Sequence, residues 1–519
     1  MNLSNLIENL DYSIICGSID TEVTDITNDS RKSGEGMLYF AIPGATVDGA
    51  HFIPDVIRKG ASVIITERTE DKLSEILQDD MTVNGSFEEI KSETVTILTV
   101  PSTRYAMGII SSRFYGEPSK QLTVIGITGT KGKTTTSYMI KDMLELAGVK
   151  TGLIGTIEVQ TGSRSIPANN TTPESIYIHN VMKEMVENKL ECVVMEVSSQ
   201  GLMLDRIAGV DFDYGIFTNL SPDHIGPNEH DSFENYRDCK KKLFSLAKKG
   251  IYNIDDPEAA YMMEGSTAYP ITFGESDEAD YQAVGHRLFI EDGIMGIEYE
   301  LEGTLEGTIR VALPGEFSIH NSLAALVVAD CMGVSFDEIK RILSEIRVRG
   351  RVEMIPISDK FTLMIDYAHN GMSLESLLNA IREYNPKRIV TLFGCGGNRA
   401  KSRRYEMGEV SGRLSDFTII TSDNPRKEEP QAILDDIKVG IGKTDGKYID
   451  IIDRKEAIRY AIMNAEEGDV IILAGKGHED YQEINGVKHH MDERELIKEV
   501  LEEENVSKIC GYNNRYFAE

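Results

Sequence analysis

Residues 122–136, LTVIGITGTKGKTTT, have the types and spacing of a phosphate-binding loop. An apolar strand pattern runs into a glycine-rich turn whose backbone N–H groups can converge on an anion, and a helical pattern follows. Lys133 would supply a positive charge for the outer phosphates, and the Thr134 hydroxyl is placed to ligate the magnesium ion that accompanies ATP. The spacing is GxxGxxGKT rather than the strict GxxxxGK[ST], so an ordinary strand-to-helix turn is the alternative. The residues expected to contact the nucleotide are Gly129, Thr130, Lys131, Gly132, Lys133, Thr134 and Thr135.

A second chemical group is the carboxylate of Glu196, at the end of the apolar run VVMEVSS. An acidic side chain in a buried strand requires a partner, and beside a phosphate loop a magnesium ion is the natural one. The alternative is a salt bridge or a strand end that faces solvent.

Length and composition restrict the class of protein. A chain of 519 residues is too long for one core and suggests three domains. The formal charge is −31, from 54 Lys and Arg against 85 Asp and Glu, without a basic block, which argues against a nucleic-acid partner. Six scattered cysteines and the lack of a leader favour a cytoplasmic protein with reduced thiols, and no apolar run is long enough to span a membrane.

Strand and helix patterns alternate along the chain and predict an α/β fold of three domains: residues 1–100, 101–346 and 347–519. The central domain should contain a doubly wound parallel sheet of the P-loop type, flanked by a smaller N-terminal α/β domain and a C-terminal Rossmann-like α/β domain. The predicted strands are 37–42, 61–66, 94–100, 191–196, 214–219, 361–366, 388–393, 417–421 and 470–474. In such a sheet, ligands bind where the strands end.

A series of motifs along nearly the whole chain resembles the Mur ligase family, whose members join amino acids to the UDP-muramyl peptide precursor of the bacterial cell wall. Their order and spacing carry the resemblance more than any single motif does. The motifs are DSRKSGEGMLYFAIPGATVDGAHFI (29–53), GITGTKGKTTT (126–136), NTTPE (170–174), MEVSSQGL (195–202), TNLSPDH (218–224), YRDCKKKLF (236–244), LPGEFSIHNSLAA (313–325), GRVE (350–353), DYAH (366–369), FGCGGNR (393–399), SDNPR (422–426) and GKGHEDYQ (475–482).

The resemblance implies an ATP-dependent ligase that activates a carboxylate as an acyl phosphate and joins it to an amine, with ATP and magnesium as cofactors. The expected substrates are UDP-N-acetylmuramoyl-L-alanyl-D-glutamate and meso-diaminopimelate, and we expect a cytoplasmic monomer that acts in peptidoglycan precursor synthesis. Lys133, Glu196, His224 and Lys240 are the implied catalytic residues. Thr134, Glu196, His224 and Lys240, the last as a carbamate, are the implied metal residues. By composition alone, Lys240 could instead belong to a solvated basic patch with Lys241 and Lys242.

Further contacts follow from the same resemblance. Asn321 would read adenine, and Arg351 and Asp366 would reach the phosphates and ribose. Asn321 could instead cap a helix, and Arg351 could be an exposed linker residue. The residues implied to bind the UDP-sugar and peptide are Ser30, Arg31, Asp48, His51, Thr171, Thr172, Ser198 and Arg206. The alternatives are that the residues of the DSR and DGAHF elements are turn residues, and that the Thr-Thr-Pro segment is a loop before a helix.

The incoming amino acid is implied by Asp423, Asn424, Pro425 and Arg426, because an arginine fork can bind the distal carboxylate that distinguishes meso-diaminopimelate from lysine. Arg399, Gly475 and Glu479 would surround the same end of the substrate. The alternative for Arg426 is a surface charge beside Lys427 and Glu428.

Four residues, Gln200, Ser318, Asn370 and Asn398, depart from the usual family pattern and leave open a paralogue with altered contacts. The alternatives for the function are therefore an L-lysine-adding or paralogous Mur ligase, another amide ligase of the superfamily of the folylpolyglutamate or cyanophycin type, and a P-loop switch protein without ligase chemistry.

Overall fold

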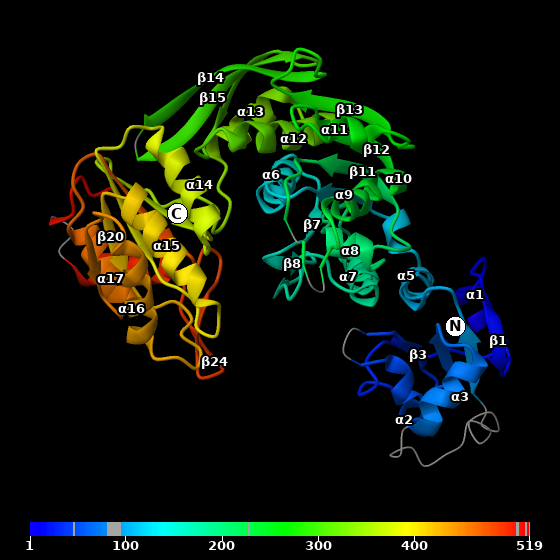
Figure 1. Cartoon of the computed structure of the whole chain (residues 1–519). Coiled ribbons are helices and arrows are strands. Elements are labelled where there is room, and N and C mark those ends of the chain that lie inside the picture. Colours follow the sequence, from blue (N-terminus) through cyan, green and yellow to red (C-terminus); the bar gives the residue numbers. More distant parts are fainter. Residues whose placement is uncertain are drawn as a thin grey trace. The chain divides into compact units, whose positions relative to one another are not determined.

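The computed structural model describes residues 1–44, 47–79, 95–223, 225–226, 229–291, 293–504, 508–513 and 516–517. The chain divides into two compact units, Met1–Phe273 and Gly274–Glu519, whose elements are labelled in Figure 1. Among the described residues, no helix has both the length and the apolar character needed to cross a membrane.

The first unit begins with a five-stranded sheet of order β1-β5-β4-β3-β2, in which all neighbours except β1 and β5 are parallel. Successive residues of β3 enter opposite cores, Leu38 and Phe40 on one face and Tyr39 and Ala41 on the other, so helices cover both faces. The elements are α1 (Leu3–Leu6), β1 (Ser13–Cys16), β2 (Ile26–Thr27), β3 (Leu38–Ala41), the 3-10 helix η1 (Gly49–Phe52), α2 (Ile53–Arg58), β4 (Val63–Thr66), α3 (Glu70–Asp79) and β5 (Thr96–Thr99).

The rest of the first unit is built on a larger sheet of order β13-β12-β11-β6-β10-β7-β8-β9. Its central strands β12, β11, β6, β10 and β7 are parallel, so their carboxyl ends meet at one edge. The strands are β6 (Thr123–Thr128), β7 (Thr151–Ile154), β8 (Glu158–Gln160), β9 (Ser165–Pro167), β10 (Cys192–Glu196), β11 (Phe212–Phe217), β12 (Ala247–Asn253) and β13 (Tyr269–Gly274). The helices are α5 (Thr103–Phe114), η2 (Pro118–Lys120), α6 (Lys133–Leu146), α7 (Ser175–Glu187), α8 (Ser199–Met203), α9 (Phe233–Lys241), α10 (Leu243–Leu246) and α11 (Ala259–Met263).

The second unit starts with an antiparallel meander of β14 (Tyr281–Glu291), β15 (Ile294–Gly303) and β16 (Gly307–Val311). Two helices, α12 (Phe317–Cys331) and α13 (Phe336–Glu345), follow it. α12 is apolar on most of its surface and is buried along nearly its whole length, as expected for a helix packed on several sides.

A six-stranded sheet of order β17-β18-β22-β19-β20-β21 forms the remainder of the second unit. Helices α14, α15 and α16 contribute to the core on one face, and α17 and α18 to the core on the other. The elements are β17 (Glu353–Met354), β18 (Thr362–Asp366), α14 (Gly371–Arg382), β19 (Arg388–Phe393), α15 (Lys401–Leu414), β20 (Phe417–Ile420), α16 (Pro430–Ile441), β21 (Tyr448–Asp450), α17 (Arg454–Met463), β22 (Asp469–Ala474), β23 (Tyr481–Ile484), β24 (Val487–His490) and α18 (Glu493–Glu503).

The predicted α/β class and the three-domain architecture built around a large, mainly parallel sheet are confirmed. The predicted strands all exist, with ends that differ by one or two residues; 388–393 is identical to β19. The largest shift concerns β11, which begins at Phe212, two residues before the predicted start at Tyr214.

Candidate functional site

The phosphate loop lies between β6 and α6, as the sequence predicts. Gly129 has φ +151° and Gly132 has φ +84°, both in the range that favours glycine. A Cβ on Gly129 would lie 1.9 Å from Thr218 Oγ1, so a side chain would not fit there. Gly132 is the N-cap of α6 and has no side chain that could cap the helix, so the start of α6 presents its positive dipole end to the loop.

Two lysine side chains converge on this loop. Lys133 Nζ donates to the carbonyl oxygens of Gly129 at 2.9 Å and Thr130 at 3.1 Å, and Lys240 Nζ donates to Gly129 O at 2.8 Å. Lys240, in α9, is only 1% exposed, so it does not belong to a solvated basic patch; Lys242, at the end of the same helix, is exposed. Burial, together with the charge of Lys133, holds the pKa of Lys240 well below its usual range.

The Glu196 carboxylate is fully buried beside the loop, so the solvent-facing alternative is wrong. β10 pairs with β6 and places Glu196 opposite Ile127. The carboxylate accepts hydrogen bonds from Thr134 Oγ1 at 3.0 Å, and from the backbone N and Oγ1 of Thr156, each at 2.9 Å. All three of these donors are neutral, so none of them supplies a positive charge to the carboxylate.

Thr134 and Glu196 offer the oxygen donors that magnesium prefers, at the edge of a loop shaped for phosphates. The buried carboxylate with neutral donors therefore fits a divalent cation. Lys240 carries an amine, which magnesium does not favour as a ligand, so it would join the site as a carbamate. His224, the remaining predicted metal residue, lies outside the described residues.

The residues predicted to hold the peptide acceptor gather around Glu196. Thr172 Oγ1 donates to Glu196 O and accepts from Ser198 N, both at 2.9 Å. Arg206 Nη1 donates to Thr172 O at 3.0 Å, and Thr171 Oγ1 lies 3.0 Å from Thr156 Oγ1. The expected helix after Pro173 begins at Ser175, so the Thr-Thr-Pro segment is a loop before a helix and also part of this hydrogen-bonded group.

In the N-terminal part of this unit, the predicted UDP-binding residues lie in turns. Arg31 is exposed and donates three hydrogen bonds to the Asp29 carboxylate, two from its side chain and one from its backbone N, and they lower the pKa of that carboxyl to about 2. Asp48 caps η1 through Ala50 N and also accepts two hydrogen bonds from Arg68. The turn-and-cap alternative is thus correct as local structure. The cap and the contacts with Arg68 do not use every lone pair of the Asp48 carboxylate, so this local structure is compatible with a ligand role.

Ser30 and His51 complete this predicted set. Ser30 is half-buried, and its carbonyl oxygen accepts a hydrogen bond from Lys59 Nζ at 2.9 Å. His51 is exposed, in η1. The structure therefore places these two side chains in the same turns as Arg31 and Asp48.

The predicted nucleotide residues of the second unit are placed on three elements. Asn321 is 5% exposed and lies inside α12, whose N-cap is Glu316, so the capping alternative for Asn321 is wrong. Arg351 is half-buried, with its guanidinium carbon 5.0 Å from the centre of the Tyr367 ring, and is not an exposed linker residue. Burial raises the pKa of Asp366, whereas the charge of Arg351 opposes that shift.

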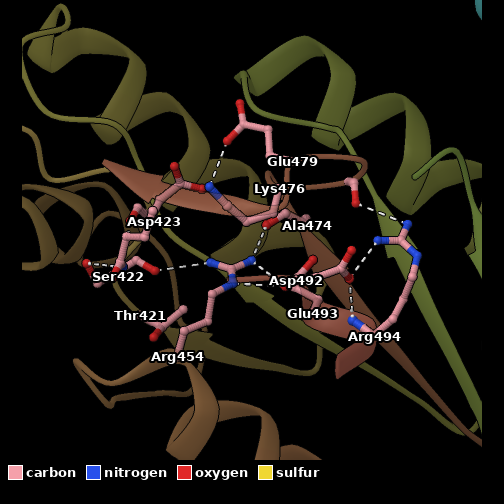
Figure 2. A network of polar contacts seen from close by, with 12 residues as sticks. Thr421, Ser422, Asp423, Arg454, Ala474, Lys476, Glu479, Asp492, Glu493 and Arg494 are labelled. Carbon is pink, nitrogen blue, oxygen red and sulfur yellow. Dashed lines mark hydrogen bonds and ion pairs between the residues drawn. The ribbon is translucent and has the colours of Figure 1, made fainter. Parts of the chain in front are cut away.

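Two loops in the second unit bring together residues predicted to bind the amino acid, and Figure 2 shows part of this network. Asn424 Nδ2 donates to Glu479 Oε2 at 2.9 Å. Lys476 is fully buried, and its Nζ donates to Glu479 Oε2 at 2.7 Å and to Asn424 Oδ1 at 3.2 Å. Gly475 has φ +104°, and a Cβ there would lie 3.3 Å from Asp423 Oδ2, so the two loops approach closely at this position.

Arg426 is held at the edge of these loops. Its Nε donates to Glu483 Oε2 at 3.0 Å and its Nη1 to Gly397 O at 2.8 Å. The Arg426 backbone, with φ +54°, donates to Glu483 O at 2.9 Å. These contacts fix the guanidinium, so the alternative of an unattached surface charge is wrong. Arg399, by contrast, is exposed in the loop after β19.

Sequence reasoning missed several polar residues of these sites. Thr156 has no motif around it, Glu483 directly follows the GKGHEDYQ motif, and Lys476 lies within that motif but was not predicted to have a role. Arg454 and Glu493 form an ion pair in which both side chains are almost completely buried. These two residues are 39 positions apart, and no pattern in the sequence indicates that they pair. Lys476 could have been predicted, because it lies inside a motif that was recognised.

Three family models match successive parts of the chain. They are described as Mur ligase family, catalytic domain, over residues 22–115; Mur ligase middle domain, over residues 127–329; and Mur ligase, glutamate ligase domain, over residues 350–477.

Curated relatives match nearly the whole chain. A protein of Caldanaerobacter subterraneus subsp. tengcongensis named "UDP-N-acetylmuramoyl-L-alanyl-D-glutamate--2,6-diaminopimelate ligase" is 40% identical over 505 residues, which cover 97% of this chain and 99% of the relative. A Clostridium perfringens protein of the same name is also 40% identical, over 511 residues, which cover 97% of this chain and all of the relative.

Solved structures share the fold. A ligase structure whose title carries the same enzyme name aligns with a TM-score of 0.68 and 25% identity over 97% of this chain and 99% of that one. A Thermotoga maritima MurF ligase, solved with ADP, aligns with a TM-score of 0.54 and 18% identity over 93% of this chain and 97% of that one, which supports the fold alone.

Proposed function

The chain belongs to the Mur ligase family, and from its site residues we propose that it is the ATP-dependent ligase that adds meso-diaminopimelate to UDP-N-acetylmuramoyl-L-alanyl-D-glutamate. The product would be a peptidoglycan precursor. The observation that carries the proposal is the arrangement at the phosphate loop, where the buried carboxylate of Glu196 and the amines of Lys133 and Lys240 approach one turn.

The proposed reaction has two steps. The terminal carboxylate of the acceptor peptide attacks the γ-phosphorus of ATP, which gives an acyl phosphate and releases ADP. The amine of the incoming amino acid then attacks the acyl carbon, the phosphate leaves, and the amine loses a proton. Each step crowds negative charge at the phosphates, and Lys133 with the N–H groups at the start of α6 would stabilise that charge.

Thr134 and Glu196 would hold magnesium, with His224 and a carbamate on Lys240 as further ligands. When bound, the metal supplies positive charge that neutralises phosphate oxygens. The depressed pKa of Lys240 supports the carbamate, because the neutral amine is the form that reacts with carbon dioxide. Asn321, Arg351 and Asp366 would complete nucleotide binding.

The choice of amino acid would depend on Arg426. Two contacts orient its guanidinium and leave further N–H donors for a carboxylate of the substrate. Asn424, Asp423 and Glu479 would hold the neighbouring amine, and Gly475 and Arg399 would lie around the same end of the substrate. A lysine substrate has no distal carboxylate for the guanidinium to bind, which favours diaminopimelate over the L-lysine alternative.

The acceptor would bind through Thr171, Thr172, Ser198 and Arg206, and its UDP end through Ser30, Arg31, Asp48 and His51. Residues 1–100 would then bind the UDP-sugar, and residues 101–346 would bind ATP. Residues 347–519 would close on the nucleotide and bind the amino acid. We further propose that the enzyme acts as a cytoplasmic monomer on small molecules, without a nucleic-acid or membrane partner.

The test is ATP-dependent phosphate release with the UDP-muramyl dipeptide and one amino acid at a time. We expect meso-diaminopimelate to support turnover and L-lysine to support little. Preference for L-lysine would replace the proposed substrate, and turnover with a folate or another acceptor would favour the other amide ligases of the superfamily.

A further inference from the structure

The carboxyl ends of β20 and β22 lead directly into the two loops of the proposed amino-acid site. Asp423 and Asn424 follow β20 after two residues, and Gly475 and Lys476 follow β22 at once. β19 lies between β20 and β22 in the sheet, so no ladder hydrogen bond joins these two strands to each other. β19 pairs with both strands as far as Ile420 and Ala474, so the sheet holds the strand ends, and contacts made beyond them must set the spacing of the two loops.

Arg454 connects the chain segments at the starts of the two loops, as Figure 2 shows. Its Nη1 donates to Ser422 O at 3.2 Å, and its Nη2 donates to Ala474 O at 3.1 Å. Ser422 is the first residue of the 422–426 loop, and Ala474 lies immediately before the loop that begins at Gly475. The planar fork of an arginine suits this task, because one rigid group reaches two acceptors at a fixed separation.

Glu493 neutralises this arginine. Arg454 Nε donates to Glu493 Oε1 at 2.9 Å, and the two side chains are 1% and 0% exposed. Arg454 begins α17, where the helix dipole disfavours a cation, so helix stability does not account for its position. A buried ion pair is also weak evidence for stability, because its desolvation offsets much of the attraction.

Displacement of either strand end would move groups of the proposed site. Lys476, two residues after Ala474, donates to both Asn424 Oδ1 and Glu479 Oε2. Gln482 Nε2 donates to Asp423 O at 2.7 Å and ties the same loops a second time. Both contacts join the residues of the two loops that carry the proposed substrate contacts.

We propose that Arg454, neutralised by Glu493, is a positioning residue for the incoming amino acid: its guanidinium fixes the spacing between the 422–426 loop and the 475–482 loop. This inference rests on the proposed function, since it takes those loops as the amino-acid site. Neither residue touches the substrate; they act through the loop backbones.

The test compares Arg454→Lys with a control at the opposite end of the same sheet. Lys keeps the charge but cannot reach two carbonyl groups with a rigid fork. The control is Arg388→Lys, since Arg388 donates two hydrogen bonds to Asp469, which is 1% exposed and begins β22. A third variant, Glu493→Asp, keeps the negative charge and withdraws it by one methylene group.

We measure KM for meso-diaminopimelate, ATP and the UDP-muramyl dipeptide in the full-length enzyme, together with the melting temperature. Arg454→Lys and Glu493→Asp should raise KM for diaminopimelate about tenfold, because small misplacements of binding groups weaken binding strongly, and should leave the other two KM values within about twofold. Arg388→Lys should lower the melting temperature without a change in KM for diaminopimelate.

Equal changes in all three KM values, or a lower melting temperature with KM for diaminopimelate unchanged, would overturn the proposal. So would failure of both Arg454→Lys and Glu493→Asp to fold, since the pair would then serve stability. Wild-type enzyme that rejects diaminopimelate would refute the proposed substrate instead. The same comparison would then be made with the amino acid that the wild type uses.

Discussion

Lys240 shows how strongly one side chain depends on its surroundings. Its amine is almost fully buried and lies 2.8 Å from Gly129 O, in a place that penalises an ammonium ion. Conversion to a carbamate would reverse the sign of the group beside a site that fits magnesium. Burial favours the neutral amine that reacts with carbon dioxide, and the proposed metal would favour the carbamate that results.

Lys240→Ala should lose nearly all turnover, because the carbamate ligand disappears while a small cavity replaces the side chain. Short-chain carboxylic acids added to this variant should restore part of the activity, since a carboxylate can occupy the place of the carbamate. Phosphate release, measured with and without acetate or propionate, checks this. Lys242→Ala is the matched control, since Lys242 is exposed at the end of the same helix and should keep its activity.

A fully active enzyme in which Lys240 is unmodified would count against this prediction. Mass spectrometry under native conditions, or a density map of the ATP-bound enzyme, would detect the carbamate. Equal stimulation of Lys242→Ala by the same acids would show a general effect on the enzyme rather than occupation of one site.

Arg426→Ala should depress the use of meso-diaminopimelate far more than the binding of ATP or of the UDP-muramyl dipeptide. A charged bidentate pair in a closed site is worth a few kcal/mol, so kcat/KM for diaminopimelate should fall about a hundredfold or more. L-Lysine should remain a poor substrate, because the change removes an attraction without adding a site for an ammonium ion. Steady-state kinetics with each amino acid measures both effects.

Lys427→Ala provides the comparison for Arg426, since Lys427 is the exposed neighbour and should have little effect on kcat/KM. Equal use of diaminopimelate by Arg426→Ala and wild type would remove Arg426 from substrate selection. The contact with Glu483 would then have a purely structural purpose.

At the scale of elements, sequence predicts best those strands whose apolar runs stand between clear turns. β19 has the predicted ends because residues 388–393 are mostly apolar or β-branched after the first position and both flanks carry turn residues. α12 was harder, because Asn321 reads equally well as a helix start. The structure begins this helix at Phe317, so the apolar residues on both sides of Asn321 outweigh its capping preference.

The turn at Gly350 gives a prediction at the same scale. Gly350 has φ +67°, and a Cβ there would lie 2.2 Å from His478 N and 2.4 Å from Gly477 C. These are backbone atoms that cannot turn aside. Gly350→Ala should therefore combine the cost of a left-handed residue with a clash, and should destabilise the protein by about 2–4 kcal/mol.

Gly333→Ala separates the two contributions to that cost. Gly333 has φ +84°, but a Cβ there would meet no atom within 4 Å. Its replacement should therefore cost only about 1–2 kcal/mol, the penalty of the backbone conformation. Urea unfolding of both variants measures the difference; equal losses would show that the loop around Gly477 and His478 moves without cost.

At the scale of the whole molecule, sequence predicted residues that follow parallel strands, because the carboxyl ends of such strands meet at one edge. Gly129, in the loop after β6, and Glu196, at the end of β10, were predicted from local patterns, and the parallel pairing of β6 with β10 brings them to the same edge. Arg454 and Glu493 were not predicted, because each begins a helix and they meet only when α17 and α18 pack on the sheet. Contacts made by packing, rather than by strand order, leave no pattern along the chain.

The molecule as a whole should couple ATP hydrolysis to amide formation. Residues proposed for the phosphates, such as Lys133 and Glu196, and residues proposed for the amino acid, such as Asn424 and Arg426, lie far apart in the sequence and on separate sheets. A P-loop switch protein needs only the first set to release phosphate, whereas a ligase needs both. With ATP and the UDP-muramyl dipeptide but no amino acid, steady-state phosphate release should fall to about 1% of the full rate, because the second step lacks its nucleophile. Sustained phosphate release without any amine acceptor would contradict the ligase mechanism and would support the switch alternative. Phosphate release that meso-diaminopimelate restores, with one amide formed for each phosphate, would establish the coupling.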